Sequence, residues 1–93
     1  MYYVYAMISD NKNRIYVGMT TDINKRVNEH NAGKTKSTKF HRPWKVFYFE
    51  KFEDRISARF REKQLKAGWG KEFLREILKH NAPVAHSDRA TAF

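Results

Sequence analysis

The 93-residue sequence contains no cysteine, which excludes a disulfide scaffold and a thiolate zinc site. This absence fits a reducing compartment, and we expect a cytoplasmic protein. The sequence also lacks any apolar run that approaches the ~18 residues needed to span a membrane, so we do not expect a membrane-spanning segment. Its first residues show neither a basic leader nor a small-residue cleavage site, and we therefore expect no signal peptide.

Acidic residues are scarce as well. Asp and Glu total 10 against 19 Lys and Arg, which gives a formal net charge of +9 and an isoelectric point of about 10.0. A small domain needs a charge magnitude of only about 2–8 to remain soluble. The basic excess, which runs through residues 1–80, therefore favours a polyanionic partner over solubility alone. Nucleic acid comes first among such partners, and an anionic membrane surface second.

A chain of this length forms one domain, because two cores would each be too small to be stable. Alternating apolar residues predict strands at 2–8, 14–18 and 44–52, and helical periodicity predicts helices at 23–31, 55–67 and 71–79. We expect an α+β fold in which a small three-stranded antiparallel sheet is flanked by about three helices. Residues 1–80 form this domain. Residues 81–93, with Pro83 and no periodicity, are predicted to be a C-terminal tail.

Two tyrosine motifs, Tyr3-Val4-Tyr5 and Tyr16-Val17-Gly18, lie on the first two predicted strands. If the polar residues 10–13 form a four-residue loop, Tyr5 faces Gly18 across the hairpin, and Tyr16 lies on the same side of the sheet. The other side is then a plain aliphatic face formed by Val4, Ala6, Ile8, Ile15 and Val17.

The first predicted helix has N-cap oxygens in Thr20-Thr21-Asp22 and a stop at Gly33. His30 lies on its apolar stripe, and Arg26 lies beside that stripe. Lys34 and the residues that follow are basic and rich in hydroxyl groups, and we predict a loop there. The expected strip for binding a nucleic-acid backbone consists of Lys34, Lys36, Lys39, Arg42 and Lys45; a flexible, solvated loop is the alternative.

Asp54 can cap the second predicted helix, and Gly68 and Gly70 are expected to end it. A helix that is apolar on two sides is usually enclosed, here between the sheet and the third helix. Glu62 flanks one of the apolar stripes, so we expect it to be partly covered. The two stripes consist of Ile56, Phe60 and Ala67 on one side, and Ala58 and Leu65 on the other.

These residues resemble the GIY-YIG nuclease superfamily, most closely its small bacterial stand-alone members. The two tyrosine motifs match the family's motifs, with Tyr3 in place of the usual glycine. The family's helical arginine, the histidine or tyrosine one turn later, and the metal-binding glutamate match Arg26, His30 and Glu62. Met19 is a departure, because some members carry a lysine there. The resemblance covers about residues 1–80 and implies a catalytic set of Tyr5, Tyr16, Arg26, His30 and Glu62.

Two of these residues have alternative interpretations that the spacing leaves open. Arg26 would clamp the scissile phosphate through its planar fork of donors, or it is a solvated arginine beside Glu29. Glu62 would be the single protein ligand of Mg²⁺ or Mn²⁺, or it is a helix residue that pairs with Lys66 or Arg59.

The phenols and the imidazole have alternatives too. Tyr5 is a candidate general base or water-orienting group, and Tyr16 a partner of the phosphate or the base, but tyrosines are also common structural residues of strands. His30 would polarise the water or contact phosphate, or it is a buried, hydrogen-bonded histidine. The four histidines show no metal-ligand spacing, so we reject a zinc site.

The resemblance implies a metal-dependent endonuclease that hydrolyses phosphodiester bonds, in DNA more than in RNA. The chain has no room for a second, DNA-selecting domain, so we expect low sequence specificity or a protein partner that supplies it. Met19 and the small size motivate an alternative, a catalytically weak nucleic-acid-binding module. A third hypothesis is a protein-interaction adaptor that uses the aromatic strand at 44–52.

Overall fold

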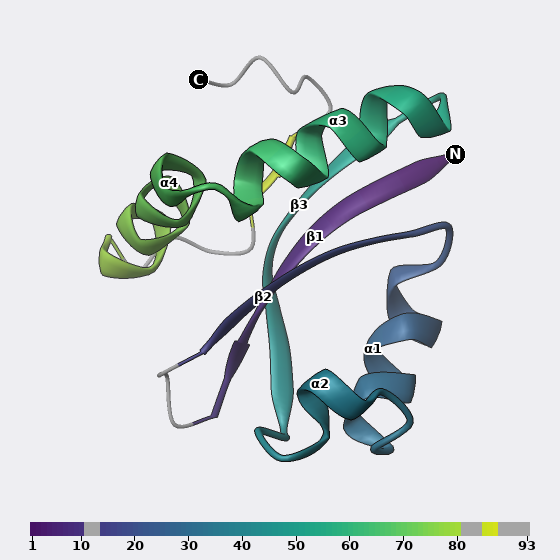
Figure 1. Cartoon of the computed structure of the whole chain (residues 1–93), viewed down its shortest axis with the longest axis vertical. Coiled ribbons are helices and arrows are strands. Elements are labelled where there is room, and N and C mark those ends of the chain that lie inside the picture. Colours follow the sequence, from purple (N-terminus) through teal and green to yellow (C-terminus); the bar gives the residue numbers. More distant parts are fainter. Residues whose placement is uncertain (11–13, 81–84, 88–93) are drawn as a thin grey trace.

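The computed structural model describes residues 1–10, 14–80 and 85–87, in which a sheet lies between two layers of helices (Figure 1). In chain order the elements are β1 (Tyr2–Ser9), β2 (Ile15–Thr20), α1 (Ile23–Asn31), α2 (Lys36–Lys39), β3 (Trp44–Phe52), α3 (Arg55–Lys66), α4 (Gly68–Lys79) and β4 (Ala85–Ser87). The helices α3 and α4 cover one face of the sheet, and α1 and α2 cover the other.

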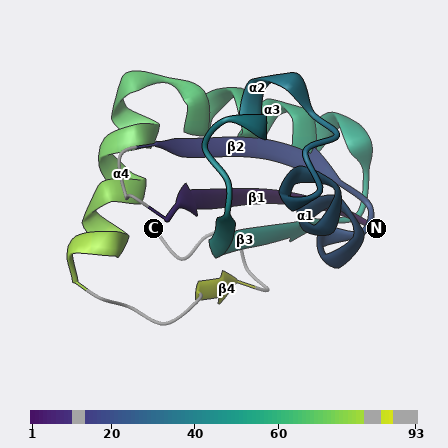
Figure 2. The same cartoon turned by 90° about the horizontal axis from the view of Figure 1, so that it is seen from below.

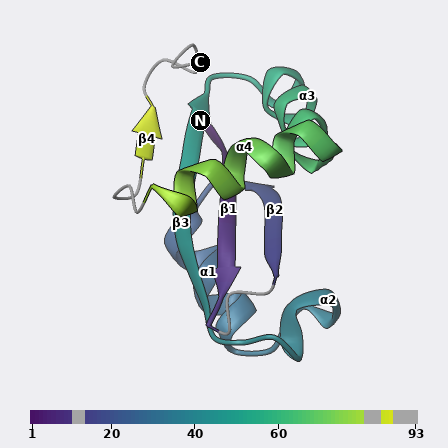
Figure 3. The ribbon, with the colours of Figure 1, turned by 90° about the vertical axis from the view of Figure 1, so that its left-hand side faces the viewer.

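The strand order is β2-β1-β3-β4 (Figure 2, Figure 3). The first three strands are antiparallel, which confirms the predicted α+β architecture. β4 pairs in parallel with β3 and lies inside the predicted tail, where no sequence pattern indicated a strand. The rest of that tail, residues 81–84 and 88–93, lies outside the described residues, as do residues 11–13 of the predicted hairpin loop.

The β1–β2 hairpin has the predicted register, with Tyr5 opposite Gly18. The amide of Ser9 donates to the carbonyl of Arg14 at 3.0 Å, where the loop begins. Tyr5 packs on the α1 side of the sheet together with Trp44. The five predicted aliphatic side chains lie on the opposite face, under α3 and α4, and they are Val4, Ala6, Ile8, Ile15 and Val17.

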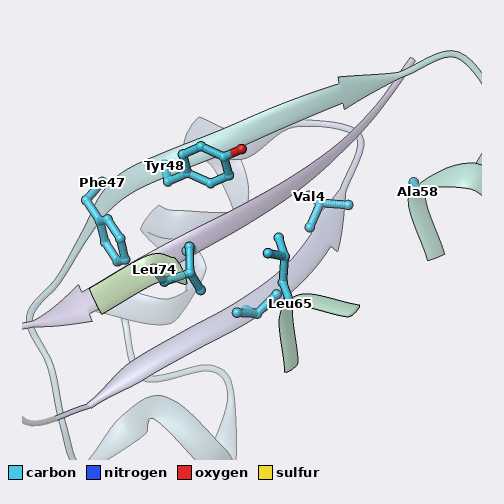
Figure 4. Packing of buried hydrophobic residues seen from close by; sticks show 8 residues of the cluster. Val4, Phe47, Tyr48, Ala58, Leu65 and Leu74 are labelled. Carbon is cyan, nitrogen blue, oxygen red and sulfur yellow. The ribbon is translucent and has the colours of Figure 1, made fainter. Parts of the chain in front are cut away.

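β3 contains a β-bulge, because its pairing with β1 skips Phe47. Phe47 and the next residue, Tyr48, consequently both join the core under the helices, where Leu65 projects from α3 and Leu74 from α4 (Figure 4). One strand thereby supplies two adjacent aromatic rings to the same cluster.

The junction between α3 and α4 corrects the prediction that Gly68 and Gly70 end the second helix. Ala67 has an extended backbone that ends α3, and Gly68 is already the first residue of α4. Gly70 lies against the last turn of α3, where a Cβ atom would be 2.5 Å from the Cα of Leu65. Glycine is needed here because two helical backbones approach closely, rather than because a helix stops.

The prediction that α3 is enclosed on two sides is wrong. Ala58 and Leu65 are fully buried, but Ile56 and Phe60 are 83% and 65% exposed. The close contact with α4 lies at the end of α3, so the outer stripe of α3 remains uncovered by the described residues. None of the described helices has the length and apolar character that a bilayer crossing requires.

α1 begins and ends as predicted. The side chain of Asp22 accepts a hydrogen bond from the amide of Lys25 at 3.1 Å. Beyond its end Gly33 has a φ of 81°, and the amides of Gly33 and Lys34 donate to carbonyls of the last turn. This is the glycine cap common at helix ends.

The segment predicted as a basic loop contains the short helix α2, which is a further correction. Thr38 is its one buried residue, and the Thr38 carbonyl accepts a hydrogen bond from Nε1 of Trp44 at 2.8 Å. The carboxamide of Asn31 also accepts from the backbone amide of Trp44, at 2.6 Å. These contacts hold α2 against the end of α1 and the start of β3.

Candidate active site

The hydroxyl of Tyr5 starts a hydrogen-bonded chain inside the fold. It lies 2.9 Å from Nε2 of His30, whose Nδ1 lies 2.8 Å from Oγ1 of Thr38. The Thr38 hydroxyl in turn lies 3.3 Å from the carbonyl oxygen of Thr35. Tyr5, His30 and Thr38 are all buried. One strand, β1, and two helices, α1 and α2, therefore meet at this chain of side chains.

The direction of the chain follows from its last acceptor. A carbonyl oxygen can only accept, so the Thr38 hydroxyl donates to Thr35 and accepts from Nδ1–H of His30. Nε2 of His30 is then unprotonated and accepts from the hydroxyl of Tyr5. His30 is thus held as a neutral imidazole whose basic nitrogen faces Tyr5.

Tyr16 and Gly18 shape the space around the Tyr5 hydroxyl. A Cβ atom on Gly18 would lie 2.6 Å from that hydroxyl oxygen, so only glycine leaves room for it. The half-buried ring of Tyr16 packs edge-on against His30, with centroids 4.9 Å apart. The second tyrosine motif therefore contributes the Tyr16 ring to the site, and its glycine, Gly18, leaves space for the Tyr5 hydroxyl.

Burial shifts the proton affinities of the two linked groups in opposite directions. Burial raises the pKa of Tyr5 to about 12, helped by Tyr16 and opposed by the Arg26 guanidinium. Burial, followed by the charge of Arg26, lowers the pKa of His30 from its usual 6.5. A free phenolate is therefore not available at neutral pH. To accept a proton from water, the neutral Tyr5 must pass its own hydroxyl proton to another group, and Nε2 of His30 is placed to accept it.

The lowered pKa of His30 predicts a stability that falls in acid. The unfolded chain binds a proton at this histidine near pH 6.5, whereas the buried imidazole resists protonation. The free energy of unfolding should therefore decrease as the pH falls from 7 to 5, by at most about 1.4 kcal/mol per pH unit from this group. Urea unfolding at several pH values measures this. If a His30→Gln variant loses as much stability between pH 7 and pH 5 as the unsubstituted protein, the pH dependence does not come from His30.

Arg26 lies half-buried on α1, one turn before His30. Its Nη1 is 2.9 Å from Oε1 of Glu29, and this ion pair raises the pKa of Arg26 and lowers that of Glu29. Arg26 also interacts electrostatically with Tyr5 and Tyr16. The pair with Glu29, which was the alternative interpretation, is present, and the guanidinium nevertheless remains close to the Tyr5 phenol.

Glu62 is largely buried, with its side chain 11% exposed, as its predicted place beside an apolar stripe requires. Oε2 is 3.2 Å from Nζ of Lys66, and Oε1 is 3.9 Å from Nε of Arg59. Both ion pairs of the alternative interpretation therefore exist. The carboxylate also interacts electrostatically with Tyr5, where its charge contributes to the raised pKa of the phenol.

The five residues of the expected backbone-binding strip are all exposed. Lys39 lies 5.6 Å from the ring centroid of the exposed Phe40, and the guanidinium of Arg42 packs directly on Gly33. Lys45 lines an open groove of about 380 Å³ between α1 and β3. The strip thus follows α2 and its flanks, the same part of the chain that supplies Thr38, and it consists of Lys34, Lys36, Lys39, Arg42 and Lys45.

A buried ion pair under α3 was missed by sequence reasoning. Glu50 of β3 is fully buried, and its carboxylate accepts from the hydroxyl of Tyr48 and lies 3.0 Å from Nε of Arg61. Burial, followed by the hydrogen bond to Glu50, raises the pKa of Tyr48. Because Arg61 precedes Glu62, this pair anchors the turn of α3 that carries Glu62. The one signal for it was a glutamate within an aromatic strand.

A sequence profile described as "GIY-YIG catalytic domain" matches residues 1–72 of this chain. The match includes both tyrosine motifs and the segments that carry Arg26, His30 and Glu62. The chain belongs to the GIY-YIG family. Its two tyrosine motifs lie within the matched residues, and tyrosine stands at position 3, where the family usually has glycine.

The relatives of this GIY-YIG chain include several UPF0213 proteins. One from Syntrophus aciditrophicus is 37% identical over 81 residues, which cover 85% of this chain and 91% of the relative. HQ_3675A from Haloquadratum walsbyi is 39% identical over 67 residues, which cover 71% and 74%. lwe0147 from Listeria welshimeri is 49% identical over 55 residues, which cover 58% and 61%. The chain thus spans about half to three fifths of the Listeria relatives' length.

A solved structure shares the fold of this GIY-YIG chain. The solution NMR structure of UPF0213 protein BH0048 from Bacillus halodurans superposes with a TM-score of 0.50 and 28% sequence identity. The superposition covers 83% of this chain and 85% of that one. The predicted fold and the predicted family are both confirmed.

Proposed function

We propose that this GIY-YIG protein is a divalent-metal-dependent endonuclease that hydrolyses phosphodiester bonds, in DNA more than in RNA. The observation that carries the proposal is the buried hydrogen-bonded chain of Tyr5, His30 and Thr38, with Arg26 beside it. Phosphodiester hydrolysis needs an activated water, charge stabilisation at the phosphoryl oxygens and a stabilised leaving oxygen. The hydrogen-bonded side chains and the residues proposed to act with them offer a group for each of these three requirements.

Tyr5 and His30 would act together as the base. The attacking water gives a proton to the Tyr5 oxygen while the Tyr5 hydroxyl proton passes to Nε2 of His30. This concerted shift avoids the phenolate that the pKa of about 12 disfavours at neutral pH. Thr38 holds the imidazole in the tautomer that can accept the proton, because it occupies Nδ1–H.

Arg26 would bind the scissile phosphate through its fork of N–H donors, which matches two phosphoryl oxygens. Tyr16, at the half-exposed edge of the site, would contact the same phosphate or orient Tyr5. Glu29 would release Arg26 when the phosphate arrives, since a charged phosphate competes well for a guanidinium.

Glu62 would be the protein ligand of the metal. The described residues contain no group of three His, Cys, Asp or Glu side chains that could form a closed metal cage. A single, largely buried carboxylate instead fits Mg²⁺, which usually keeps several waters and completes its shell with substrate phosphate. GIY-YIG nucleases typically use a divalent metal. When bound, it would polarise the phosphoryl oxygen and stabilise the leaving oxygen.

The exposed lysines and arginines on and around α2 would hold the flanking nucleic-acid backbone. Contacts of this kind bind phosphates without reading bases. We therefore propose low intrinsic sequence specificity, or a protein partner that supplies it.

The endonuclease proposal is tested with labelled duplex, single-stranded and branched DNAs and matching RNAs, in Mg²⁺ or Mn²⁺. We expect cleavage of at least one substrate, loss of cleavage on removing the metal with EDTA, and recovery when Mg²⁺ is restored in excess. Gel electrophoresis of the products measures each step. Binding of the whole panel without cleavage at any metal concentration would exclude the endonuclease.

A second candidate function is a nucleic-acid-binding module with little turnover. Met19, where some family members carry a lysine, is half-buried and packs with the aliphatic core under α3, so this position supplies no cation. Such a module would still lose affinity steeply with salt, with a log–log slope of about −0.9 per neutralised phosphate. Binding titrations at several salt concentrations in EDTA measure this slope, and a flat response would exclude nucleic acid for both candidates.

The structure gives the adaptor hypothesis little support. Three of the five aromatic rings of the strand at 44–52, those of Trp44, Phe47 and Tyr48, are buried in the two cores, and Phe49 and Phe52 are half-buried.

A further inference from the structure

Both oxygens of the Glu62 carboxylate face a cation of α3. Lys66 lies one turn after Glu62, with Nζ 3.2 Å from Oε2, and Arg59 lies one turn before, with Nε 3.9 Å from Oε1. The carboxylate is largely buried, whereas both cationic side chains are 53% exposed. The proposed metal ligand therefore already has positive neighbours, and these neighbours have room to move away.

We propose that Lys66 is an internal counter-ion that occupies the cation position on Glu62 until metal and substrate arrive, and that its ammonium group then transfers to a substrate phosphate. This inference rests on the proposed function, and it adds to it a residue and a coupling between two ligands. Lys66 is the better candidate of the two cations, because its distance is that of a close ion pair and its stem is long and flexible.

The physical reason for an exchange lies in the burial of the carboxylate. A carboxylate removed from water is costly unless a cation or hydrogen-bond donors compensate it. Lys66 provides this compensation in the free protein. A divalent cation would replace it with twice the charge, but Lys66 must leave first because two cations at one carboxylate oxygen repel each other.

Arg26 and Glu29 form the corresponding pair on α1. The proposed phosphate ligand is held by an internal anion at 2.9 Å, as the proposed metal ligand is held by an internal cation. Nucleic acid and metal together would satisfy both groups at once, since the phosphate attracts Arg26 and Lys66 while the metal binds Glu62. We therefore expect weak metal binding by the free protein and stronger binding in the presence of nucleic acid.

The first experiment measures Mn²⁺ binding to the free protein by electron paramagnetic resonance of the unbound ion. Lys66→Gln should tighten Mn²⁺ binding on the order of three- to tenfold, because it removes the competing charge. Lys63→Gln is the matched control, since Lys63 is an exposed lysine of the same helix for which the structure shows no ion pair within the described residues. It should change the affinity by less than about twofold, because it removes only a distant, screened charge. Glu62→Gln should remove the binding.

The outcomes separate clearly. Equal Mn²⁺ affinities for Lys66→Gln and Lys63→Gln would overturn the counter-ion role, and so would weaker binding by Lys66→Gln. Mn²⁺ binding that survives in Glu62→Gln would show that the ion binds elsewhere and would also overturn the inference.

The second experiment measures the coupling with an oligonucleotide whose phosphorothioate linkages resist hydrolysis. Its presence should increase the Mn²⁺ affinity of the unsubstituted protein, and Mn²⁺ should increase the affinity for the oligonucleotide by the same factor. The increase should be smaller in Lys66→Gln, in which no counter-ion has to leave. An equal increase in both proteins would overturn the exchange. Neither experiment reads cleavage, so a protein that fails to cut DNA leaves this test intact, and a failed exchange leaves the endonuclease proposal standing.

Discussion

Cleavage should fall by roughly 10³-fold or more when Glu62 is replaced by glutamine, and by a similar factor for Arg26→Ala. Glutamine keeps the size of Glu62 but removes the charge that would hold the metal. Alanine at position 26 removes the guanidinium that would bind the phosphate, and α1 retains its caps at both ends. Initial rates on the best substrate of the panel, at saturating Mg²⁺, measure the effect.

Two matched controls show whether the loss is local. Glu72→Gln removes an exposed acid from α4, and Lys25→Ala removes the exposed cation next to Arg26 on α1. Both should retain activity within a few-fold. Circular dichroism and thermal unfolding should show folded protein in all four variants, and normal cleavage by either site variant would refute its assigned role.

The largest change in stability is expected at Glu50. Removing its carboxylate with Glu50→Ala should cost about 3–5 kcal/mol in the free energy of unfolding, because the nearly buried guanidinium of Arg61 loses the Glu50 charge and Tyr48 loses the Glu50 oxygen as an acceptor. A small domain is stable by only about 5–15 kcal/mol, so this variant would be close to unfolding at room temperature. Urea unfolding followed by tryptophan fluorescence measures the change.

The exposed Glu53, three residues further along the chain, provides the control for Glu50. Glu53→Ala should change the free energy of unfolding by less than about 0.5 kcal/mol. A triple variant with Glu50→Leu, Arg61→Met and Tyr48→Phe should recover most of the loss, because well-packed apolar residues can replace a buried ion pair. If Glu50→Ala is as stable as Glu53→Ala, the buried pair does not hold α3 in place.

The hairpin and the first helix could be predicted because short-range rules specify them. Strand alternation and a four-residue loop place Tyr5 opposite Gly18, and helical spacing places Arg26 and His30 one turn apart. The resemblance then named the residues of the proposed site. Which of them touch was beyond the sequence, since the contact between Tyr5 and His30 joins residues 25 positions apart.

What could not be predicted depends on tertiary packing. A four-residue helix such as α2 leaves no periodic pattern, so Thr38 looked like any other hydroxyl of a basic loop. Gly70 has the composition of a helix stop but serves the close approach of two helices. Ile56 and Phe60 satisfy the pattern of a buried stripe, yet α4 lies elsewhere, and no local rule contains that information.

The position of Thr38 on α2 has a consequence for how this domain could change over evolutionary time. The four-residue helix that supplies Thr38 to the imidazole also carries two of the lysines proposed to hold the backbone. An insertion, deletion or transplanted segment that adapts the protein to a new nucleic acid and displaces Thr38 would therefore remove the group that sets the tautomer of His30. Relatives that diverge in this segment should have diverged in pH optimum and in substrate preference together. An engineer who wants to separate the two properties would have to keep Thr38 and vary only its exposed neighbours.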